Sequence, residues 1–509
     1  MIDSRYQKCR IYSELSQEDK SFWFDLRCKN FLHNIDTFYY SVLLQNDFTA
    51  ASSDLNVKKL REYFNKFKVA DFCDVVPISI PGCNVQLNYR AFTFSGMYNY
   101  CIECPEVFDI FIAETVPTEV TSQIIVQLRS RPLWLDTTVG AFEYSYDVVK
   151  AVCKFFGLTI TSVKENRVDY AWHTNYLQNP EQFFRIDNFA KMQVSRFKSV
   201  QYLYHFKRND EYENDYISLG RRSDKCFVRI YLKSKEVIEQ QAKPWFLQIW
   251  KDNKMINEYD FYVYNKLYDI GRWVMLDSCR LMFYVEHGTD ESYKAECRRL
   301  LEQETPNYDV ISILADRLTP PVTLVTNVEF QTTRKSSKSY CLIENPDNKK
   351  YGECSRIYDY MDNRRLITEY LTRATLRLID PNMDSNKSRC DYCAFWAALR
   401  ATKQMEVRRS KKQLKLVRDY SRNKSIDAVK KRMTNSIITY SLYLKGINED
   451  DVLQDATDAV IMLNDNDIQN MKKYKVRKSY EFSQEDLQNP IAEISRNRGF
   501  IDFDTGELL

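Results

Sequence analysis

The chain has 509 residues, which is more than one hydrophobic core usually organises, so we expect two to four domains. Its 44% apolar content is that of a folded protein, and its 11 glycines form neither a GxxxxGK[ST] nor a GxGxxG loop, which argues against a nucleotide-driven motor. The formal charge of +3 does not indicate a partner, because nucleic-acid binding depends on where charges lie. Without a long apolar run or an apolar N-terminal leader, we expect a cytoplasmic protein that does not enter a membrane.

The first part of the chain, up to about residue 75, is predicted to be helical. Ser16 followed by Asp19 has the spacing of a capping box, and Phe22 and Phe31 are among the apolar anchors that follow. Asp54 is placed to begin a second helix. We therefore predict a helical N-terminal region over residues 1–78.

From about residue 80 the apolar period shifts toward two, which indicates strands. Alternating side chains run over residues 85–90, and an apolar segment covers 124–128. A helix is expected over 145–156, ending at Gly157, because glycine adopts the left-handed cap without strain. An extended segment over 158–172 follows. Strand, strand, helix, strand is an α+β pattern.

A second block of the same kind covers residues 198–286. Its predicted strands lie at 200–206, 216–219, 227–232 and 281–285, and one more apolar segment lies at 322–330. Strands of this kind with single helices between them favour antiparallel sheets covered by helices over a doubly wound parallel sheet. We predict an α+β fold with two related halves, helical extensions at both ends, and a catalytic domain over 79–345.

The C-terminal region, 346–509, is predicted to be helical, with a helix from about 355 to 378. Residues 403–432 hold twelve Lys or Arg against three acids, a net charge of +9, and residues 449–467 hold seven carboxylates and no base. A basic helix of this kind can bind DNA phosphates, or can be a solvated surface. The candidate DNA-binding residues here are Arg408, Arg409, Lys411, Lys412, Lys415 and Arg418.

Fourteen cysteines in a chain of this length are too dilute for a disulfide framework. Two pairs have CxxC spacing, Cys101 with Cys104 and Cys390 with Cys393. They are far apart in sequence, so a shared zinc site would need them to meet in the fold.

The segment from Phe227 to Lys233 is the most informative strand. Because alternate side chains of a strand point to opposite faces, Val228, Ile230 and Leu232 form a buried face. Arg229, Tyr231 and Lys233 then share the other face, with each cation about 7 Å along the strand from the phenol. Positive charge of this kind favours a nucleophilic phenolate and binds phosphate. A tyrosine between cations is also a common half-exposed strand position.

A second strand, Arg167 to His173, places Arg167, Asp169 and His173 on one face. Asp169 and His173 are the candidate metal ligands, although about 13 Å of strand separates them and a bend or third ligand would be needed. Asp169 beside Arg167 is equally typical of a structural ion pair. Between the two strands, residues 216–225 predict a hairpin turn whose cations Arg221, Arg222 and Lys225 could clamp a DNA backbone.

The turn with Gly220, Arg221, Arg222 and Ser223, followed by Arg229, Ile230, Tyr231 and Lys233, resembles the replication initiation factor family. Its members are rolling-circle initiators of the Rep_trans type and related relaxases of conjugative elements. The resemblance covers roughly residues 80–400, and Arg167, Asp169 and Ala171 are similar to the family's R-x-D-x-A strand. The pattern departs at His173, where many members have a second aspartate, and a third acidic ligand is not evident, Glu286 being a candidate.

The resemblance implies a DNA nicking-closing enzyme in which Tyr231 forms a covalent 5′-phosphotyrosine and Arg229 and Lys233 offset transition-state charge. Mg²⁺ or Mn²⁺ would be held by Asp169, with His173 as the second candidate. Implied partners are the origin duplex and single strand, a host helicase and a second copy of the chain, in a bacterial cytoplasm. The alternatives are an origin DNA-binding replication protein that has lost catalysis and a structural adaptor with no DNA role.

Overall fold

The computed structural model describes residues 4–25, 29–45, 50–67, 75–90, 97–114, 122–177, 180–197, 199–206, 212–333, 340–343, 364–403 and 415–418, and the single residues 357, 361, 405 and 436. The chain divides into two compact units. The first comprises residues 1–334 and 355–410, and the second comprises 335–354 and 411–509.

The first unit is built on one eleven-stranded sheet with the order β2-β3-β4-β5-β6-β1-β7-β12-β11-β10-β9. Every pairing in it is antiparallel. The α+β fold with a large antiparallel sheet is therefore confirmed. The strands are β1 (Phe31–Leu44), β2 (Val75–Ile78), β3 (Leu87–Arg90), β4 (Tyr100–Cys104), β5 (Phe108–Ile112), β6 (Ile124–Leu128), β7 (Ile160–Thr174), β9 (Val200–Phe206), β10 (Tyr212–Leu219), β11 (Cys226–Leu232) and β12 (Thr326–Thr333).

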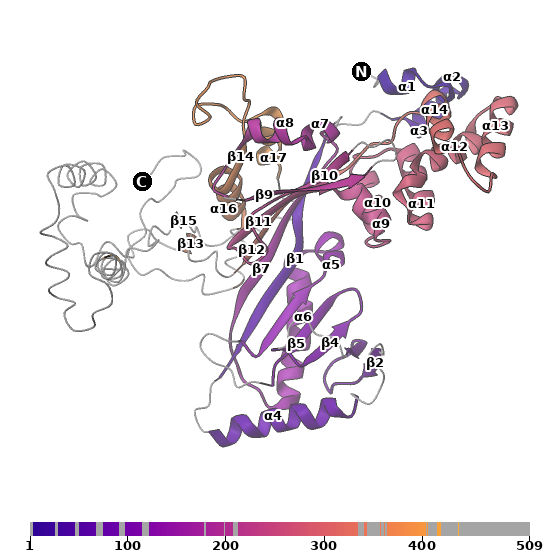
Figure 1. Ribbon diagram of the computed structural model, residues 1–509. Coiled ribbons are helices and arrows are strands. Elements are labelled where there is room, and N and C mark those ends of the chain that lie inside the picture. The colour runs from indigo at the N-terminus through magenta and orange to yellow at the C-terminus, as the bar shows by residue number, and fades with distance from the viewer. Residues whose placement is uncertain are drawn as a thin grey trace, which may run out of the picture. The chain divides into compact units, whose positions relative to one another are not determined.

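Two long strands, β1 and β7, join the two halves of this sheet (Figure 1). Their pairing runs from Phe31 opposite Thr174 to Leu44 opposite Ile160 and is interrupted by three register shifts. One shift lies between Ile35 and Thr37, so that Asp36 has no partner in the ladder. A strand bends and twists more at such an irregularity.

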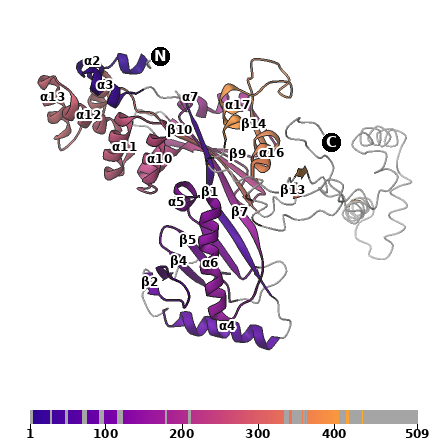
Figure 2. The ribbon, with the colours of Figure 1, turned by 180° about the vertical axis from the view of Figure 1, so that it is seen from behind.

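Helices cover the apolar face of the first half. The helix α6 (Thr138–Phe156) begins at Thr137, whose side chain accepts from the Gly140 amide, and ends at Gly157 with φ of 73°. Phe142 packs on Tyr40 with ring centroids 5.0 Å apart. The expected helix ending at Gly157 is therefore confirmed, and α4 (Ala50–Asn65) lies beside it in both views (Figure 2).

The apolar face of the second half is covered by segments from beyond the last sheet strand. In α17 (Ala394–Ala401), Trp396 is fully buried and packs on Phe330 of β12. Phe330 in turn contacts Trp172 of β7. The helix α16 (Arg364–Tyr370), the π-helical turn Leu371–Thr375 and the short strands β14 (Leu376–Leu378) and β8 (Gln193–Ser195) complete this layer, together with α7 (Pro180–Phe184) and α8 (Ile186–Met192).

A helical module separates β11 from β12. It contains α9 (Lys233–Glu239), α10 (Trp245–Asp252), α11 (Glu258–Ile270), α12 (Leu276–His287), α13 (Glu291–Leu301) and α14 (Tyr308–Leu318), with α5 (Ser130–Leu135) packed on β1 nearby. The N-terminal helices α1 (Ser4–Gln7), α2 (Arg10–Glu14) and α3 (Gln17–Trp23) pack on this module. Glu14, for example, accepts a hydrogen bond from Tyr284 at 2.7 Å.

Three predicted elements differ from the structure. The helix expected over about 355–378 does not reach its predicted end, because Leu376–Leu378 forms the strand β14. Residues 31–44 were expected to be helical but form β1, because both faces of this strand are buried and its apolar residues do not alternate cleanly. Residues 281–285 were expected to be a strand but lie in α12, with Leu281, Phe283 and Tyr284 buried. A short continuous apolar run fits a buried strand and a buried helix equally well.

Other expectations are confirmed. Ser16 accepts from the Asp19 amide at the start of α3, and the strands expected at 200–206, 216–219 and 227–232 are present. Among the described residues of the second unit, the strands β13 (Tyr340–Ile343) and β15 (Lys415–Arg418) pair in a two-stranded antiparallel sheet. The acidic stretch 449–467 lies outside the described residues. No described helix is long and apolar enough to span a membrane.

The cysteines of the two CxxC pairs are free thiols. Cys101 and Cys104 lie on β4, and Cys390 and Cys393 lie at the approach to α17. The described part of the chain brings no three metal-binding side chains of the His, Cys, Asp or Glu type together. A shared zinc site therefore has no support among these residues.

Candidate functional site

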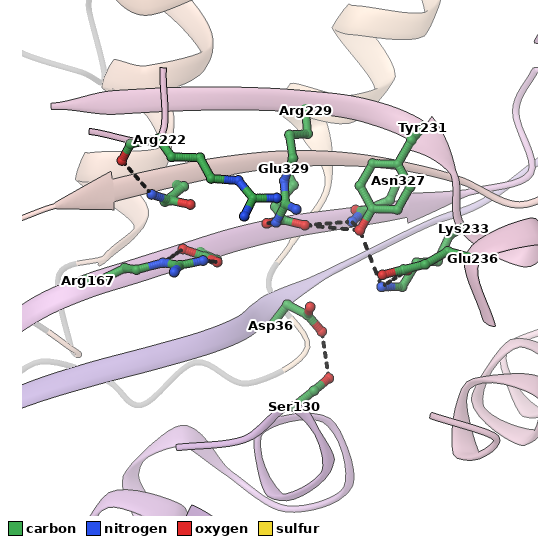
Figure 3. A network of polar contacts seen from close by, with 12 residues as sticks. Asp36, Ser130, Arg167, Arg222, Arg229, Tyr231, Lys233, Glu236, Asn327 and Glu329 are labelled. Atoms are coloured by element: carbon green, nitrogen blue, oxygen red, sulfur yellow. Dashed lines mark hydrogen bonds and ion pairs between the residues drawn. The ribbon is translucent and has the colours of Figure 1, made fainter. Parts of the chain in front are cut away.

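The polar face of β7, β12 and β11 forms the candidate site. Paired residues share a face, and the register places Tyr231 opposite Asn327 and Arg229 opposite Glu329. Val228 and Ile230 point the other way and are fully buried, as the alternation predicts. Figure 3 shows the polar side chains of this face, from Arg229, Tyr231, Asn327 and Glu329, together with Arg167, Arg222 and Lys233.

The Tyr231 hydroxyl is held by three polar partners. It donates to Oε2 of Glu329 at 3.1 Å, and it accepts from Nδ2 of Asn327 at 3.0 Å and from Nζ of Lys233 at 3.3 Å. Asn327 also donates to Glu329, at 3.2 Å. The phenol is only 7% exposed, so its oxygen is oriented by the protein rather than by solvent.

Both cations that flank Tyr231 are paired with carboxylates. Arg229 forms an ion pair with Glu329, and Lys233, which is fully buried, pairs with Glu236 at 2.5 Å. Burial raises the pKa of Tyr231 well above its usual value, and Glu329 raises it further, outweighing Arg229. Arg229 lowers the pKa of Tyr231, as expected of a nearby cation, but this effect does not offset burial and the carboxylates.

Asp169 lies on β7 and forms an ion pair with Arg167. The guanidinium donates to the carboxylate at 2.9 Å, and Asp169 is 1% exposed. Burial raises the pKa of Asp169 to about 6, with a further increase from Glu329, even though Arg167 lowers it. Asp169 is thus a buried carboxylate whose charge is only partly offset.

His173 does not fit the predicted role of metal ligand. It is fully buried, stacks on Trp134 with ring centroids 4.4 Å apart, and its Nδ1 accepts from Trp250 at 3.2 Å. A neutral ring with Nδ1 as acceptor carries its hydrogen on Nε2, so neither nitrogen offers a lone pair to a metal. Burial lowers the pKa of His173 well below its usual value.

Glu329 is a candidate site residue that the sequence analysis did not single out. It lies on β12, is 1% exposed, and bonds both Arg229 and Tyr231. The available signal was the alternation of Asn327, Glu329 and Gln331 with Val328 and Phe330, which marks a strand with one polar face.

The acid that sequence analysis considered, Glu286, lies elsewhere. It is on α12, where it pairs with Lys266 at 3.5 Å, and its side chain is 47% exposed. It is not among the residues that contact Tyr231.

Asp36, at the register shift of β1, is a second missed residue. Its carboxylate pairs with Lys243 at 2.9 Å and accepts from Ser130 at 2.6 Å. Burial opposes its ionisation, but Lys243 and Lys233 outweigh burial and hold the pKa of Asp36 below its usual range. Lys243 adopts φ of 59°, a left-handed conformation that costs free energy for a residue with a side chain.

A pocket of about 770 Å³ opens beside Tyr231. Arg222 and Arg229 line it, together with Tyr216, Leu203, Asp215 and Lys235 among others. Arg222 is exposed in the β10–β11 turn, and its carbonyl accepts from Gln331 of β12. Gly220, with φ of 83°, starts this turn, and a Cβ there would lie 2.9 Å from the Phe197 ring.

The other predicted DNA-binding residues are spread over the chain. Arg221 is exposed in the same turn, and Lys225 is half-buried before β11, but neither lines the pocket. Lys415 and Arg418 lie in the strand β15 rather than in a helix, which corrects that expectation. Arg408, Arg409, Lys411 and Lys412 lie outside the described residues.

Asp169 and Glu329 carry oxygen donors of the kind that a divalent cation prefers, and each is ion-paired with an arginine. They lie on adjacent strands of the polar face, and each raises the electrostatic cost of the other's charge, as the pKa of Asp169 shows. Mg²⁺ is commonly held by one or two carboxylates together with substrate phosphates. The donor chemistry therefore fits Mg²⁺ or Mn²⁺, although no group of three acidic, histidine or cysteine ligands occurs among the described residues.

Comparison with known proteins adds little. No protein-family model and no curated protein matches the chain. Among solved structures it is similar to the rolling circle replication initiator protein from Geobacillus stearothermophilus, with 13% identity, 74% of this chain and 100% of that chain covered, and a TM-score of 0.32. A likeness at this level assigns neither the fold nor the activity.

Proposed function

We propose that this protein is a DNA nicking-closing enzyme that initiates rolling-circle replication or conjugative transfer through a 5′-phosphotyrosine at Tyr231. One observation carries the proposal. The Tyr231 hydroxyl is fixed between the Glu329 carboxylate and the Lys233 ammonium, beside a pocket lined by Arg222 and Arg229. A positioned hydroxyl with an adjacent base and arginines suited to phosphate is what phosphoryl transfer to tyrosine needs.

In the nicking step the Tyr231 oxygen attacks the phosphorus of a DNA phosphodiester. The bond from phosphorus to the 3′ oxygen breaks, and the 5′ phosphate stays joined to the tyrosine. Glu329 takes the phenolic proton, since it already accepts that hydrogen bond, and the leaving 3′ oxygen takes a proton from water. Rejoining reverses these bonds, so no nucleotide hydrolysis is required.

The cations act on the charge that develops at the phosphate. Arg229 and Lys233 offset it in the transition state, and their charges also stabilise the phenolate once Glu329 is protonated. Asp169 would hold Mg²⁺ or Mn²⁺, which when bound polarises the scissile phosphate. The exposed Arg221 and Arg222 would bind the backbone next to the cut.

The partners follow from this chemistry. The substrate is an origin, bound as duplex and cut as a single strand, and the basic residues 403–432 would add sequence-independent affinity. A host helicase would unwind from the nick, a second copy of the chain would supply another tyrosine for rejoining, and the reaction belongs in a bacterial cytoplasm.

The test is covalent attachment. Purified protein is incubated with Mn²⁺ and 5′- or 3′-labelled single-stranded oligonucleotides drawn from the element's own origin, and the products are run on a denaturing gel. We expect label at the protein's mass from the 3′-labelled strand, and none with Tyr231→Phe. Tyr144→Phe, at an exposed tyrosine that does not line the pocket, is the matched control and should keep the adduct. An adduct that persists in Tyr231→Phe would show that Tyr231 is not the nucleophile.

The second candidate is an origin-binding replication protein without catalysis. It is favoured by the 7% exposure of Tyr231 and by the carboxylate partners of both flanking cations. This protein would bind origin duplex with a steep dependence on salt and give no adduct with any metal. The same gel, run beside a binding titration between 50 and 200 mM salt, separates the two candidates.

A further inference from the structure

We infer that the pocket beside Tyr231 binds the nucleobase of the nucleotide next to the scissile phosphate, with the base stacked on Tyr216. This inference rests on the proposed function, because it assumes that the phosphate attacked by Tyr231 belongs to single-stranded DNA. The nicking reaction uses the Tyr231 hydroxyl and the groups around it, and it does not require the rest of this pocket, which a nucleobase would occupy.

The sheet register places an aromatic and an aliphatic side chain in line with Tyr231. Tyr216 of β10 is the direct partner of Tyr231, and the next residue in this row is Leu203 of the edge strand β9. The Tyr216 and Tyr231 rings lie 6.1 Å apart at their centroids with 34° between their planes. A phosphate at the Tyr231 oxygen therefore brings the base of a flanking nucleotide within reach of Tyr216.

The exposure of this row suits a base better than protein packing. Leu203, on the edge strand β9 at the outer end of the row, is 51% exposed, and Tyr216 is half-buried. Aromatic side chains of single-strand binding proteins offer their rings to bases in this way, and the stacking tolerates any base because every base has a π-face.

Charges of both signs line the pocket. Arg222 and Arg229 of the lining come from β11 and the turn before it, whereas Glu236 and Glu239 come from α9, where Glu236 is ion-paired with Lys233 and Lys235 also lines the pocket. A phosphate is favoured at the arginines and disfavoured at the carboxylates, which sets the direction of the strand. The volume of about 770 Å³ accommodates a nucleotide unit, and an ion pair of Asp215 with Lys235 at 2.6 Å supplies polar groups for the edge of the base.

The experiment uses full-length Tyr231→Phe protein, which cannot form the adduct, and a twelve-nucleotide oligo-dT with one central 2-aminopurine. Stacking quenches 2-aminopurine fluorescence, so the base reports its own environment. We compare Tyr231→Phe protein with three double variants, each of which carries Tyr231→Phe together with Tyr216→Ala, Tyr216→Phe or Tyr144→Ala. Tyr144 is 44% exposed and does not line the pocket, which makes it the matched control.

We expect saturable quenching that Tyr216→Phe and Tyr144→Ala retain and that Tyr216→Ala loses, with affinity falling roughly tenfold. Equal quenching in Tyr216→Ala would overturn the inference. So would displacement of the oligonucleotide by dTMP at a comparable concentration, since the pocket would then be a mononucleotide site. Circular dichroism of each variant confirms folding, and Leu203→Ala gives a second, exposed position at which the affinity should fall.

The inference and the proposed function fail in different ways. If wild-type protein forms the covalent adduct but Tyr216→Ala neither weakens quenching nor changes affinity, only the base site is wrong. If wild-type protein forms no adduct and no variant binds the oligonucleotide, the nicking enzyme is wrong and the base site is lost with it.

Discussion

Glu329 contacts two groups and raises the pKa of both, so that it favours the protonated form of Arg229 and of Tyr231. Its carboxylate neutralises Arg229 and at the same time raises the pKa of Tyr231. The same contact therefore weakens the tyrosine as an acid and supplies the base that can deprotonate it. Without DNA, the phenolic hydrogen lies between the Tyr231 oxygen and Oε2 of Glu329, which are 3.1 Å apart. Additional positive charge near the phenol would lower the pKa of Tyr231 and favour transfer of the proton to Glu329.

Glu329→Gln separates these effects. Because the amide cannot take the proton, we expect covalent attachment to fall by roughly 10²–10⁴-fold. Single-stranded DNA binding should stay the same or strengthen, since Arg229 loses its counter-charge. The unfolding free energy should drop by about 3 kcal/mol, because a buried guanidinium loses its partner. Glu239→Gln, an exposed carboxylate of the same pocket, is the control, and attachment rates that match in the two variants would exclude Glu329 as the base.

At the scale of elements, the alternation of β11 was enough to separate the buried Val228 and Ile230 from Arg229 and Tyr231. The cross-strand partners were not predictable, because Asn327 and Glu329 are nearly a hundred residues further along the chain and register is set by tertiary packing. Asp36 was missed for another reason. It lies at an irregularity of a strand buried on both faces, where neither period two nor period 3.6 applies.

The contact of β1 with the loop after α9 is open to a double-mutant cycle. Asp36 and Lys243 are paired at 2.9 Å with side chains 6% and 28% exposed. We expect Asp36→Asn and Lys243→Met each to lower the unfolding free energy by roughly 2–4 kcal/mol, and the double variant to lose less than their sum by more than about 1 kcal/mol.

The exposed pair Lys58 and Glu62, 3.9 Å apart, is the reference for this cycle. A double-mutant cycle on Lys58 and Glu62 should give a coupling free energy near zero, because both side chains are well solvated. Additive losses at Asp36 and Lys243 would mean that the two charges stabilise the fold independently, and that the strained backbone of Lys243 has another cause.

At the scale of the whole molecule, the central pair β1 and β7 contains two buried histidines. His33 stacks on Trp172 with ring centroids 3.8 Å apart, and burial lowers its pKa to about 3. Burial also lowers the pKa of His173. Each ring stays neutral in the folded state while it binds a proton in the unfolded chain below about pH 6.5. The folded protein is therefore most stable, with respect to both histidines, above about pH 6.5. Its unfolding free energy decreases as the pH falls below that value, and for His33 this decrease continues to about pH 3.

The pH dependence gives a global test. Between pH 7.5 and 5.0 each neutral histidine should cost about 2 kcal/mol of unfolding free energy. His33→Phe keeps the stacking on Trp172 but cannot be protonated, so the difference in unfolding free energy between these two pH values should shrink by about 2 kcal/mol. Urea denaturation at both values measures it. An unchanged difference would show that His33 is protonated in the folded protein.

The position of β12 in the sheet has a consequence for when the protein becomes active. This strand is the last of the eleven in chain order, yet it lies between β7 and β11 and carries both Asn327 and Glu329. Strands that are far apart in sequence pair slowly, because the entropy of the intervening chain is lost on loop closure before any stabilising contact forms. During synthesis Tyr231 therefore leaves the ribosome well before Glu329, its hydrogen-bond partner, has been made. If Tyr231 acts as proposed, a newly made chain has a built-in delay before it can cut DNA, set by the insertion of one strand.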